Sequence, residues 1–264
     1  MCQDSVVMSK QPPRTRKGFW YAVIEFILRP FLMIITKRDW RGGQYLQVDG
    51  GMILAMNHLS WFDPFVAAHF ANDNGRPARF LAKSEVFKIP VIGRMLKGAG
   101  QIPVQRGTTA AVSSLHAAIE AVNKGECVVI YPEGTLTRDP QLWPMSAKNG
   151  VARIALTTGA PVIPAAQWGP QEVLAPYSKK LHVFPRKTMR VWAGPEVDLS
   201  DLRAQPMTST TLAEATSRIM RDVTLLLAQI RDETPPATPF ERSLALKPQS
   251  NETEIELGPA AGDS

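Results

Sequence analysis

Cysteine is nearly absent from this sequence, and its scarcity excludes several kinds of site. Among 264 residues only Cys2 and Cys127 occur, and two isolated cysteines cannot build a disulfide framework or a CxxC metal motif. The sequence also lacks a cluster of histidine, cysteine and carboxylate residues at metal-ligand spacing, so we expect no metal site. This composition fits a reducing, cytoplasmic setting.

Long hydrophobic runs are missing as well. The most apolar segment, residues 18–36, reads GFWYAVIEFILRPFLMIIT and is interrupted by Glu25, Arg29 and Pro30. A helix that crosses a bilayer needs about 20 apolar residues in succession, so these interruptions argue against a span. Pro30 should kink or divide the helix. Aromatic residues beside basic flanks predict a helix that lies in the membrane interface; the alternative is a helix packed on the protein's own core.

The net charge of +6 is distributed unevenly along the chain. Residues 10–42 carry eight basic and two acidic residues, whereas residues 231–264 carry three basic and seven acidic residues. A basic segment suits an anionic surface, either lipid or nucleic acid. The apolar character of the same segment favours anionic lipid, and the absence of a groove-reading motif argues against nucleic acid.

The order of patterns along the chain predicts its organisation. We expect a flexible basic N-terminus over 1–17, a membrane-interfacial helical segment over 18–42, one folded domain over 43–230 and a disordered acidic tail over 231–264. Within the domain, short apolar runs alternate with helical periods, which predicts an α/β fold with a mainly parallel central sheet flanked by helices. The expected helices cover residues 108–123, 151–159 and 210–230, and the expected strands cover 45–48, 52–56, 78–82, 101–104, 126–131, 161–167 and 188–193.

The first candidate site follows the predicted strand 52–56 and reads NHLSWFDP over residues 57–64. Ser60 with Asp63 three residues later is a capping-box pattern, so Asp63 should lie in the first turn of a helix. From there its carboxylate can accept a hydrogen bond from His58, fix the imidazole tautomer and leave the other nitrogen as a base. Capping and orientation should compete for Asp63, and we expect orientation to dominate.

Two further blocks combine a strand end with residues that suit an anion. Lys83, Gly93 and Arg106 form one, and Arg106 precedes a predicted helix, where backbone N–H groups and the helix dipole favour anions. The other, YPEGTLTR over residues 131–138, follows an apolar strand. Ligands bind at the carboxyl ends of strands in open α/β sheets. Glu133 could orient Arg106 or a substrate hydroxyl. A fourth block, VIPA over residues 162–165, is a strand that could be purely structural.

Taken in order, the four blocks resemble those of the glycerolipid acyltransferase family, in particular bacterial 1-acyl-sn-glycerol-3-phosphate acyltransferases. The resemblance covers about residues 40–195. It departs from the family pattern at Leu136, where the family usually has the arginine of its Glu-Gly-Thr-Arg box. The nearest arginine is Arg138, which would keep the same face only if this segment were a strand.

The resemblance implies acyl transfer from acyl-CoA or acyl-carrier protein to the free hydroxyl of 1-acylglycerol-3-phosphate, giving phosphatidic acid for phospholipid synthesis. It implies His58 as general base, oriented by Asp63, and direct attack on the thioester, since no G-x-S-x-G motif is present. It assigns the acceptor phosphate to a set of residues comprising Lys83, Arg106, Glu133, Gly134, Thr135 and, less directly, Arg138. No cofactor is implied, and the protein should lie on the cytoplasmic face of the cell membrane as a peripheral or monotopic protein.

Two alternatives stay open. The same chemistry could act on a different lipid or glycolipid acceptor, because Leu136 replaces the expected arginine. Alternatively, the chain could be a catalytically inactive lipid- or acyl-CoA-binding module. The presence of both His58 and Asp63 argues against that second alternative.

Overall fold

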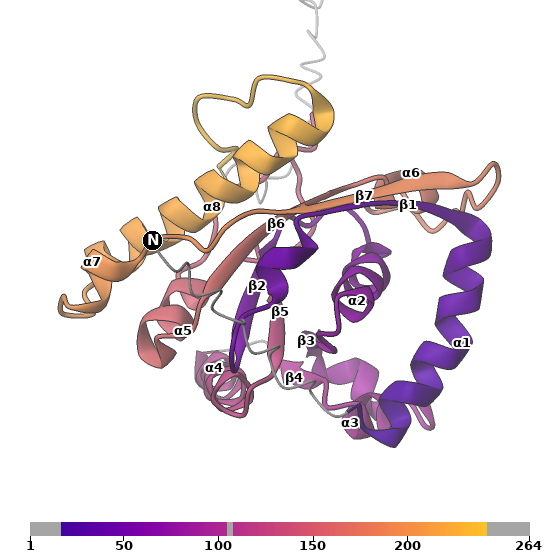
Figure 1. The fold of residues 1–264 in the computed structure, drawn as a ribbon, viewed down its shortest axis with the longest axis horizontal. Helices are drawn as coiled ribbons and strands as arrows, with labels where there is room; N and C mark the ends of the chain where they lie inside the picture. The colour runs from indigo at the N-terminus through magenta and orange to yellow at the C-terminus, as the bar shows by residue number, and fades with distance from the viewer. Residues whose placement is uncertain (1–16, 105–107, 242–264) are drawn as a thin grey trace, which may run out of the picture.

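The fold is organised around a seven-stranded sheet with the order β1-β7-β6-β2-β5-β3-β4 (Figure 1). This computed structural model describes residues 17–104 and 108–241, with the backbone alone for 108–111. All neighbouring strands run parallel except β6 and β7, which are antiparallel. The strands are β1 (Thr36–Arg41), β2 (Met52–Met56), β3 (Ala78–Lys83), β4 (Ile102–Val104), β5 (Cys127–Ile130), β6 (Val162–Trp168) and β7 (Lys187–Ala193).

Helices cover both faces of the sheet, which confirms the predicted α/β fold (Figure 1). The α-helices are α1 (Phe19–Ile35), α2 (Asp63–Asp73), α3 (Ile92–Gly98), α4 (Thr108–Asn123), α5 (Gly150–Thr158), α6 (Pro170–Val173), α7 (Ser200–Arg203) and α8 (Ser209–Arg231). Two short 3-10 helices, η1 (Gly43–Leu46) and η2 (Ser84–Lys88), connect elements.

The central strand β2 shows why the sheet needs two apolar layers. Its five residues are all buried. Leu54 packs into the cluster that contains Phe70 of α2, whereas Ile53 packs into the cluster that contains Val122 of α4 and Ile219 of α8. Because successive side chains point to opposite faces, a strand covered on both sides must be apolar throughout. This pattern made β2 and β5 readable from sequence.

Two predictions near the start of the domain are wrong. The predicted strand 45–48 is instead η1, which follows Gly42 at φ 74° and buries Leu46. The predicted helical segment 18–42 is helical only to Ile35, and residues 36–41 form β1, which pairs with β7. Since β1 lies at the sheet edge, it can carry the charged sequence TKRDWR, which gives no apolar strand pattern.

Helix α1 is not divided at Pro30 and runs unbroken from Phe19 to Ile35. Its inner face buries Tyr21, Leu32 and Ile35 against the body. Nowhere among residues 17–104 and 108–241 is a helix long and apolar enough to span a membrane.

The charges that interrupt the apolar run of α1 bind the protein body. Glu25 accepts a hydrogen bond from Asn72 at 2.6 Å, and Arg29 pairs with Asp73 at 2.9 Å, both at the end of α2. The large apolar residues of the outer face remain exposed, namely Phe19, Phe26, Ile27, Phe31, Met33 and Ile34. The helix therefore has an apolar face on each side, and only one of them is covered by described residues.

Candidate active site

The candidate site begins where β2 ends and α2 starts. His58 is almost buried and Asp63 is completely buried, and Asp63 Oδ2 lies 2.8 Å from His58 Nδ1. A carboxylate at this nitrogen fixes the tautomer that carries a proton on Nδ1, which leaves Nε2 as the basic atom. The structure thus brings together the two side chains that the sequence spacing paired.

Asp63 orients His58 and does not cap α2, whose N-cap is Phe62 without a side-chain cap hydrogen bond. Besides His58, Oδ2 accepts the backbone N–H groups of Leu59 at 2.5 Å and Ser60 at 2.8 Å. Burial raises the pKa of Asp63, and the hydrogen bonds from His58, Ser60 and Leu59 act in the opposite direction. The turn before α2 directs these N–H groups and the imidazole at the same oxygen, so Asp63 holds His58 and the turn rather than the helix end.

Two aromatic rings that the sequence analysis did not single out contact His58. The Tyr131 ring stacks on the imidazole with centroids 4.2 Å apart and planes 13° apart, and Trp61 meets it edge-on at 6.3 Å. The Lys83 ammonium lies 5.1 Å from the centre of the Trp61 ring. Trp61 belongs to the block over residues 57–64, and Tyr131 begins the block over residues 131–138. The signal in the sequence was therefore an aromatic residue within each of the two blocks.

The turn over residues 132–135, here called the PEGT turn, and the nearby Thr137 hold the backbone of His58. Glu133 is fully buried; its Oε1 accepts the His58 N–H at 2.9 Å and its Oε2 accepts the Met145 N–H at 3.0 Å. Thr137 donates its N–H to the His58 carbonyl at 2.8 Å. Burial raises the pKa of Glu133 to about 8, against the effect of its two backbone hydrogen bonds. Glu133 therefore positions His58 by binding its backbone N–H. The sequence did not indicate this role.

A second set of hydrogen bonds joins the residue after β2 to β6. Asn57 donates its amide to the Gln167 carbonyl at 3.1 Å and accepts the Gln167 N–H at 2.8 Å, while the Gln167 amide donates to the Asn57 carbonyl at 3.0 Å. Both side chains are completely buried. These bonds fix the residue immediately before His58, and nothing in the sequence pairs residues that lie 110 positions apart.

The remaining predicted binding residues surround the turn after β5. Gly134 is exposed and adopts a left-handed conformation at φ 70°, and Thr135 is half-buried. Leu136 is fully buried, whereas Arg138 is exposed beside Tyr177, with 3.4 Å between Arg138 Nε and the tyrosine hydroxyl. The segment is not a strand, so Arg138 does not share the face of Leu136.

Of the Lys83 block, the structure describes two members. Lys83 is exposed at the end of β3, next to Trp61. Gly93 is buried in α3, where an added Cβ would lie 2.0 Å from the Phe87 carbonyl oxygen, so this close approach requires glycine. Arg106 lies outside the described residues.

Comparison with known proteins places these features in a family. A family model described as Acyltransferase matches residues 37–168, half of the chain and both motif turns that hold His58. This chain belongs to the acyltransferase family. The match spans β1 to β6, so it includes the His58–Asp63 pair, Lys83 and the PEGT turn.

Individual relatives within the family carry one recurring name. The chain is 29% identical over 163 residues to the chloroplastic 1-acyl-sn-glycerol-3-phosphate acyltransferase BAT2 of Brassica napus, covering 61% of this chain and 46% of that protein. It is 29% identical over 161 residues to the 1-acyl-sn-glycerol-3-phosphate acyltransferase of Bacillus subtilis, covering 61% of this chain and 74% of that one. The chain thus spans less than half the length of the Brassica relative.

The fold is shared with a solved structure. The 1-acyl-sn-glycerophosphate acyltransferase PlsC from Thermotoga maritima superposes with a TM-score of 0.57 at 22% identity, over 79% of this chain and 80% of that one. At this identity the likeness establishes the architecture alone.

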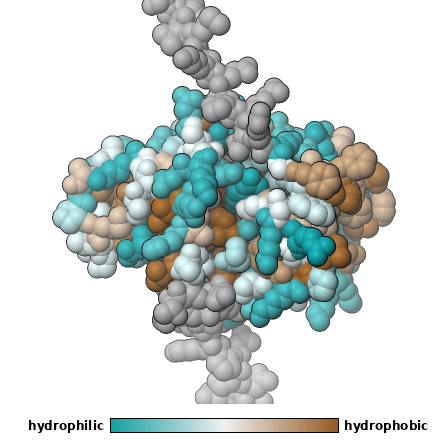
Figure 2. Space-filling view, turned by 90° about the horizontal axis from the view of Figure 1, so that it is seen from below, coloured by the Kyte–Doolittle hydropathy of each residue, from teal (hydrophilic) through white to brown (hydrophobic). Residues whose placement is uncertain are grey.

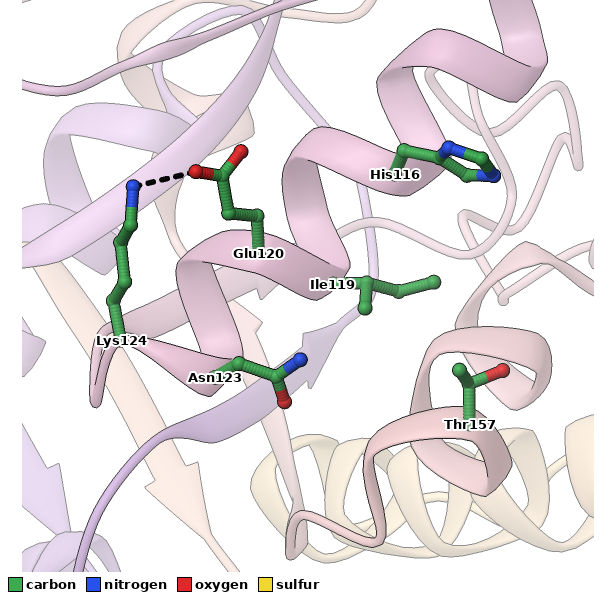
Figure 3. A pocket seen from close by; sticks show the side chains of 6 residues that line it. All are labelled: His116, Ile119, Glu120, Asn123, Lys124 and Thr157. Atoms are coloured by element: carbon green, nitrogen blue, oxygen red, sulfur yellow. Dashed lines mark hydrogen bonds and ion pairs between the residues drawn. The ribbon is translucent and has the colours of Figure 1, made fainter.

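A separate hollow of about 570 Å³ lies between α4 and α5. Figure 3 shows His116 and the ion-paired Glu120 and Lys124 on α4, with Thr157 on α5. None of the four motif blocks contributes to its lining. It is therefore not part of the candidate site.

Proposed function

We propose that this acyltransferase moves an acyl chain from a thioester donor, acyl-CoA or acyl-carrier protein, to the free hydroxyl of 1-acylglycerol-3-phosphate, giving phosphatidic acid. The observation that carries the proposal is the His58–Asp63 pair, in which a buried carboxylate holds Nδ1 and leaves Nε2 for a substrate. Membership of the acyltransferase family and the names of the relatives support the reaction and the acceptor.

The chemistry follows from that pair. His58 Nε2 removes the proton of the acceptor hydroxyl as its oxygen attacks the thioester carbonyl. Asp63 stabilises the imidazolium that forms. The carbon–sulfur bond then breaks, and the imidazolium returns the proton to the departing thiolate. The nearby Ser60 hydroxyl donates to the Leu174 carbonyl at 2.5 Å and accepts the Phe62 N–H, so it is already engaged and the attack is direct.

We assign acceptor binding to the residues of the motif blocks. Lys83 and Arg106, the latter outside the described residues, would supply positive charge, and the turn over Glu133–Thr135 would supply the Thr135 N–H and hydroxyl to the phosphate. Arg138 is exposed beside Tyr177, with its Nε 3.4 Å from the tyrosine hydroxyl, and would add a further positive charge. Glu133 acts through the His58 backbone.

Attachment to a membrane is the second part of the proposal. The outer face of α1 offers an exposed apolar stripe with Phe19 and Phe26 on it, as an interfacial helix does. The two charged residues within the helix, Glu25 and Arg29, bind Asn72 and Asp73 of α2. They therefore do not oppose insertion of the outer face into the membrane interface. The protein would then sit on the cytoplasmic face of the cell membrane, beside anionic lipids and its lipid substrates.

The test is thiol release from acyl-CoA by the full chain, with and without 1-acylglycerol-3-phosphate. Acceptor-dependent release is expected, with turnover lowered about a hundredfold or more in His58→Ala, the usual loss for a positioned base. An unchanged rate in His58→Ala contradicts the assignment of the base.

A different acceptor is the second candidate, and the burial of Leu136 favours it. A panel of lysolipids with and without a phosphate separates the two. Faster turnover with acceptors that lack phosphate would show that such an acceptor, and not 1-acylglycerol-3-phosphate, is the substrate. Binding of lipid without any thiol release would point to an inactive lipid-binding module.

A further inference from the structure

Two loops at opposite ends of α1 combine exposed apolar tips with unpaired positive charges. The first loop, residues 88–92, connects η2 to α3 and exposes Ile89, Val91 and Ile92, of which Val91 is 67% exposed. Val91 also adopts φ 68°, a conformation that β-branched residues avoid. The cations beside it are exposed and have no partner among the described residues; they are Lys88, Arg94 and Lys97.

The second loop, residues 175–186, connects α6 to β7. It exposes Leu181 by 63% and Phe184 by 69%, beside the exposed cations Lys179 and Lys180. The described part of the chain contains no carboxylate that pairs with either lysine. A large aromatic and an aliphatic side chain exposed together on one loop mark a surface that another molecule can cover.

Both loops are attached to α1. Arg186, at the end of the second loop, donates to the carbonyls of Met33 and Thr36 at 2.8 and 2.7 Å. At the other end, Trp20 packs so closely on Gly98 that an added Cβ would lie 2.0 Å from its ring. A groove of about 710 Å³ between Trp20 and the first loop is lined by these apolar and basic residues.

The three elements share one edge of the molecule. Figure 1 shows α1 along the right-hand edge, with α3 at its lower end and the loop after α6 at its upper end. Figure 2, turned about the horizontal axis, shows apolar side chains gathered at the same right-hand end. We define the docking face as the outer stripe of α1 together with residues 88–92 and 175–186.

We propose that both loops insert into an anionic lipid bilayer on either side of α1, so that the docking face seats the candidate site on the membrane. The proposal rests on the proposed function only for its purpose, because vesicle binding can be measured without any turnover. Aliphatic and aromatic tips rimmed by unpaired cations match a bilayer in which acyl chains underlie negative headgroups. An acidic protein surface would complement the cations but leave the apolar tips and the α1 stripe uncovered.

Each loop also continues directly from the candidate site. Lys83, beside Trp61, is the residue from which η2 and the first loop extend. Where the second loop begins, the Leu174 carbonyl accepts the Ser60 hydroxyl, and Tyr177 donates its hydroxyl to the Leu136 carbonyl at 2.9 Å. Contact of both tips with the bilayer would therefore bring the two segments that lead from the candidate site to the source of a lipid acceptor.

The apolar arm of the test measures flotation of the full chain with vesicles of phosphatidylcholine alone and of phosphatidylcholine mixed with phosphatidylglycerol. Val91→Ser and Phe184→Ser should each lower partitioning about tenfold or more on both vesicle types, the effect of removing one buried apolar side chain. Leu225→Ser on α8, an exposed apolar side chain (47%) away from the docking face, is the control and should change nothing.

The charge arm uses Lys88→Gln and Lys180→Gln, with Lys124→Gln on α4 as control. Each of the first two should lower partitioning about fivefold on the anionic vesicles and leave it unchanged on phosphatidylcholine, because a cation near an anionic surface acts through charge. Val91→Gly separates a loss of membrane binding from a loss of stability. It should weaken vesicle binding yet preserve the melting temperature, since glycine accepts φ 68° without strain.

The outcomes distinguish this proposal from the proposed function. Unchanged flotation of all five loop variants overturns the docking face, whatever the enzyme activity is. Unchanged flotation combined with a raised KM for an acyl-carrier protein thioester assigns the loops to an acidic protein instead. Weakened flotation with no thiol release in the wild-type chain supports the docking face and rejects the proposed reaction. With an active chain, turnover on monomeric short-chain substrates should remain at the wild-type rate in every loop variant.

Discussion

At the scale of single residues, the site is defined by how His58 is held. Asp63 fixes Nδ1, Glu133 accepts the backbone N–H, Thr137 donates to the carbonyl, and Tyr131 stacks on the ring. A base held from four directions loses little entropy when a substrate arrives. The sequence revealed Asp63 because it lies five residues away in the chain, whereas contacts across 75 residues depend on how strands are ordered.

Substitution of Glu133 tests whether this residue positions His58 or binds substrate. Glu133→Ala leaves the buried N–H groups of His58 and Met145 unpaired, so the unfolding free energy should fall by about 2–4 kcal/mol, with a fall in kcat. Glu133→Gln keeps one oxygen acceptor and should retain more of both. Denaturant unfolding and steady-state kinetics measure the two effects. A rise in KM with unchanged stability and kcat would show instead that the carboxylate contacts substrate.

At the scale of elements, α1 illustrates what a sequence pattern leaves undecided. Its apolar run predicted an interfacial helix or a helix packed on the core, and the structure shows a packed inner face together with an exposed outer stripe. Glu25 and Arg29 looked like interruptions of the apolar run until their partners on α2 were seen. Likewise, β1 was missed because an edge strand tolerates charge, so its pairing with β7 leaves no apolar period.

Two substitutions on α1 separate its faces. Leu32→Ala removes a side chain that is only 5% exposed, and the cavity should lower the unfolding free energy by about 2–4 kcal/mol. Ile34→Ala removes one that is 62% exposed and should change stability by less than about 0.5 kcal/mol. Thermal or denaturant unfolding without lipid gives both values. Equal losses would mean that the outer stripe is covered within the protein itself.

At the scale of the whole molecule, the parallel sheet was predictable and its order was not. Strands β2 and β5 read as apolar runs because helices cover both faces. Their adjacency brings the His58 turn beside the PEGT turn, and β6 on the other side of β2 brings Gln167. The sequence does not reveal that β5 and β6 are the neighbours of β2. The motif blocks could therefore be found from the sequence, but the hydrogen bonds between them could not.

The buried thiol at the centre of the sheet reports on the integrity of this arrangement. Burial raises the pKa of Cys127 from 9.0 to about 12, so the folded chain keeps it protonated at pH 8. In a Cys2→Ser chain, a disulfide reagent at pH 8 should react only as fast as the sheet opens, and rapidly in denaturant. The thiol's contribution to stability is complete below pH 9 and declines as the pH rises towards 12. Rapid labelling of the native chain would contradict the burial of β5.

The most direct test of the whole account follows an isotope-labelled acyl chain from acyl-CoA into phosphatidic acid, with 1-acylglycerol-3-phosphate as acceptor. Wild-type chain and Asp63→Asn are compared, because asparagine keeps the size of the carboxylate but not its charge. The account predicts labelled phosphatidic acid with the wild-type chain and a rate lower by about a hundredfold or more with the variant, since the imidazolium loses its buried counter-charge. Equal rates from the two folded proteins would contradict it.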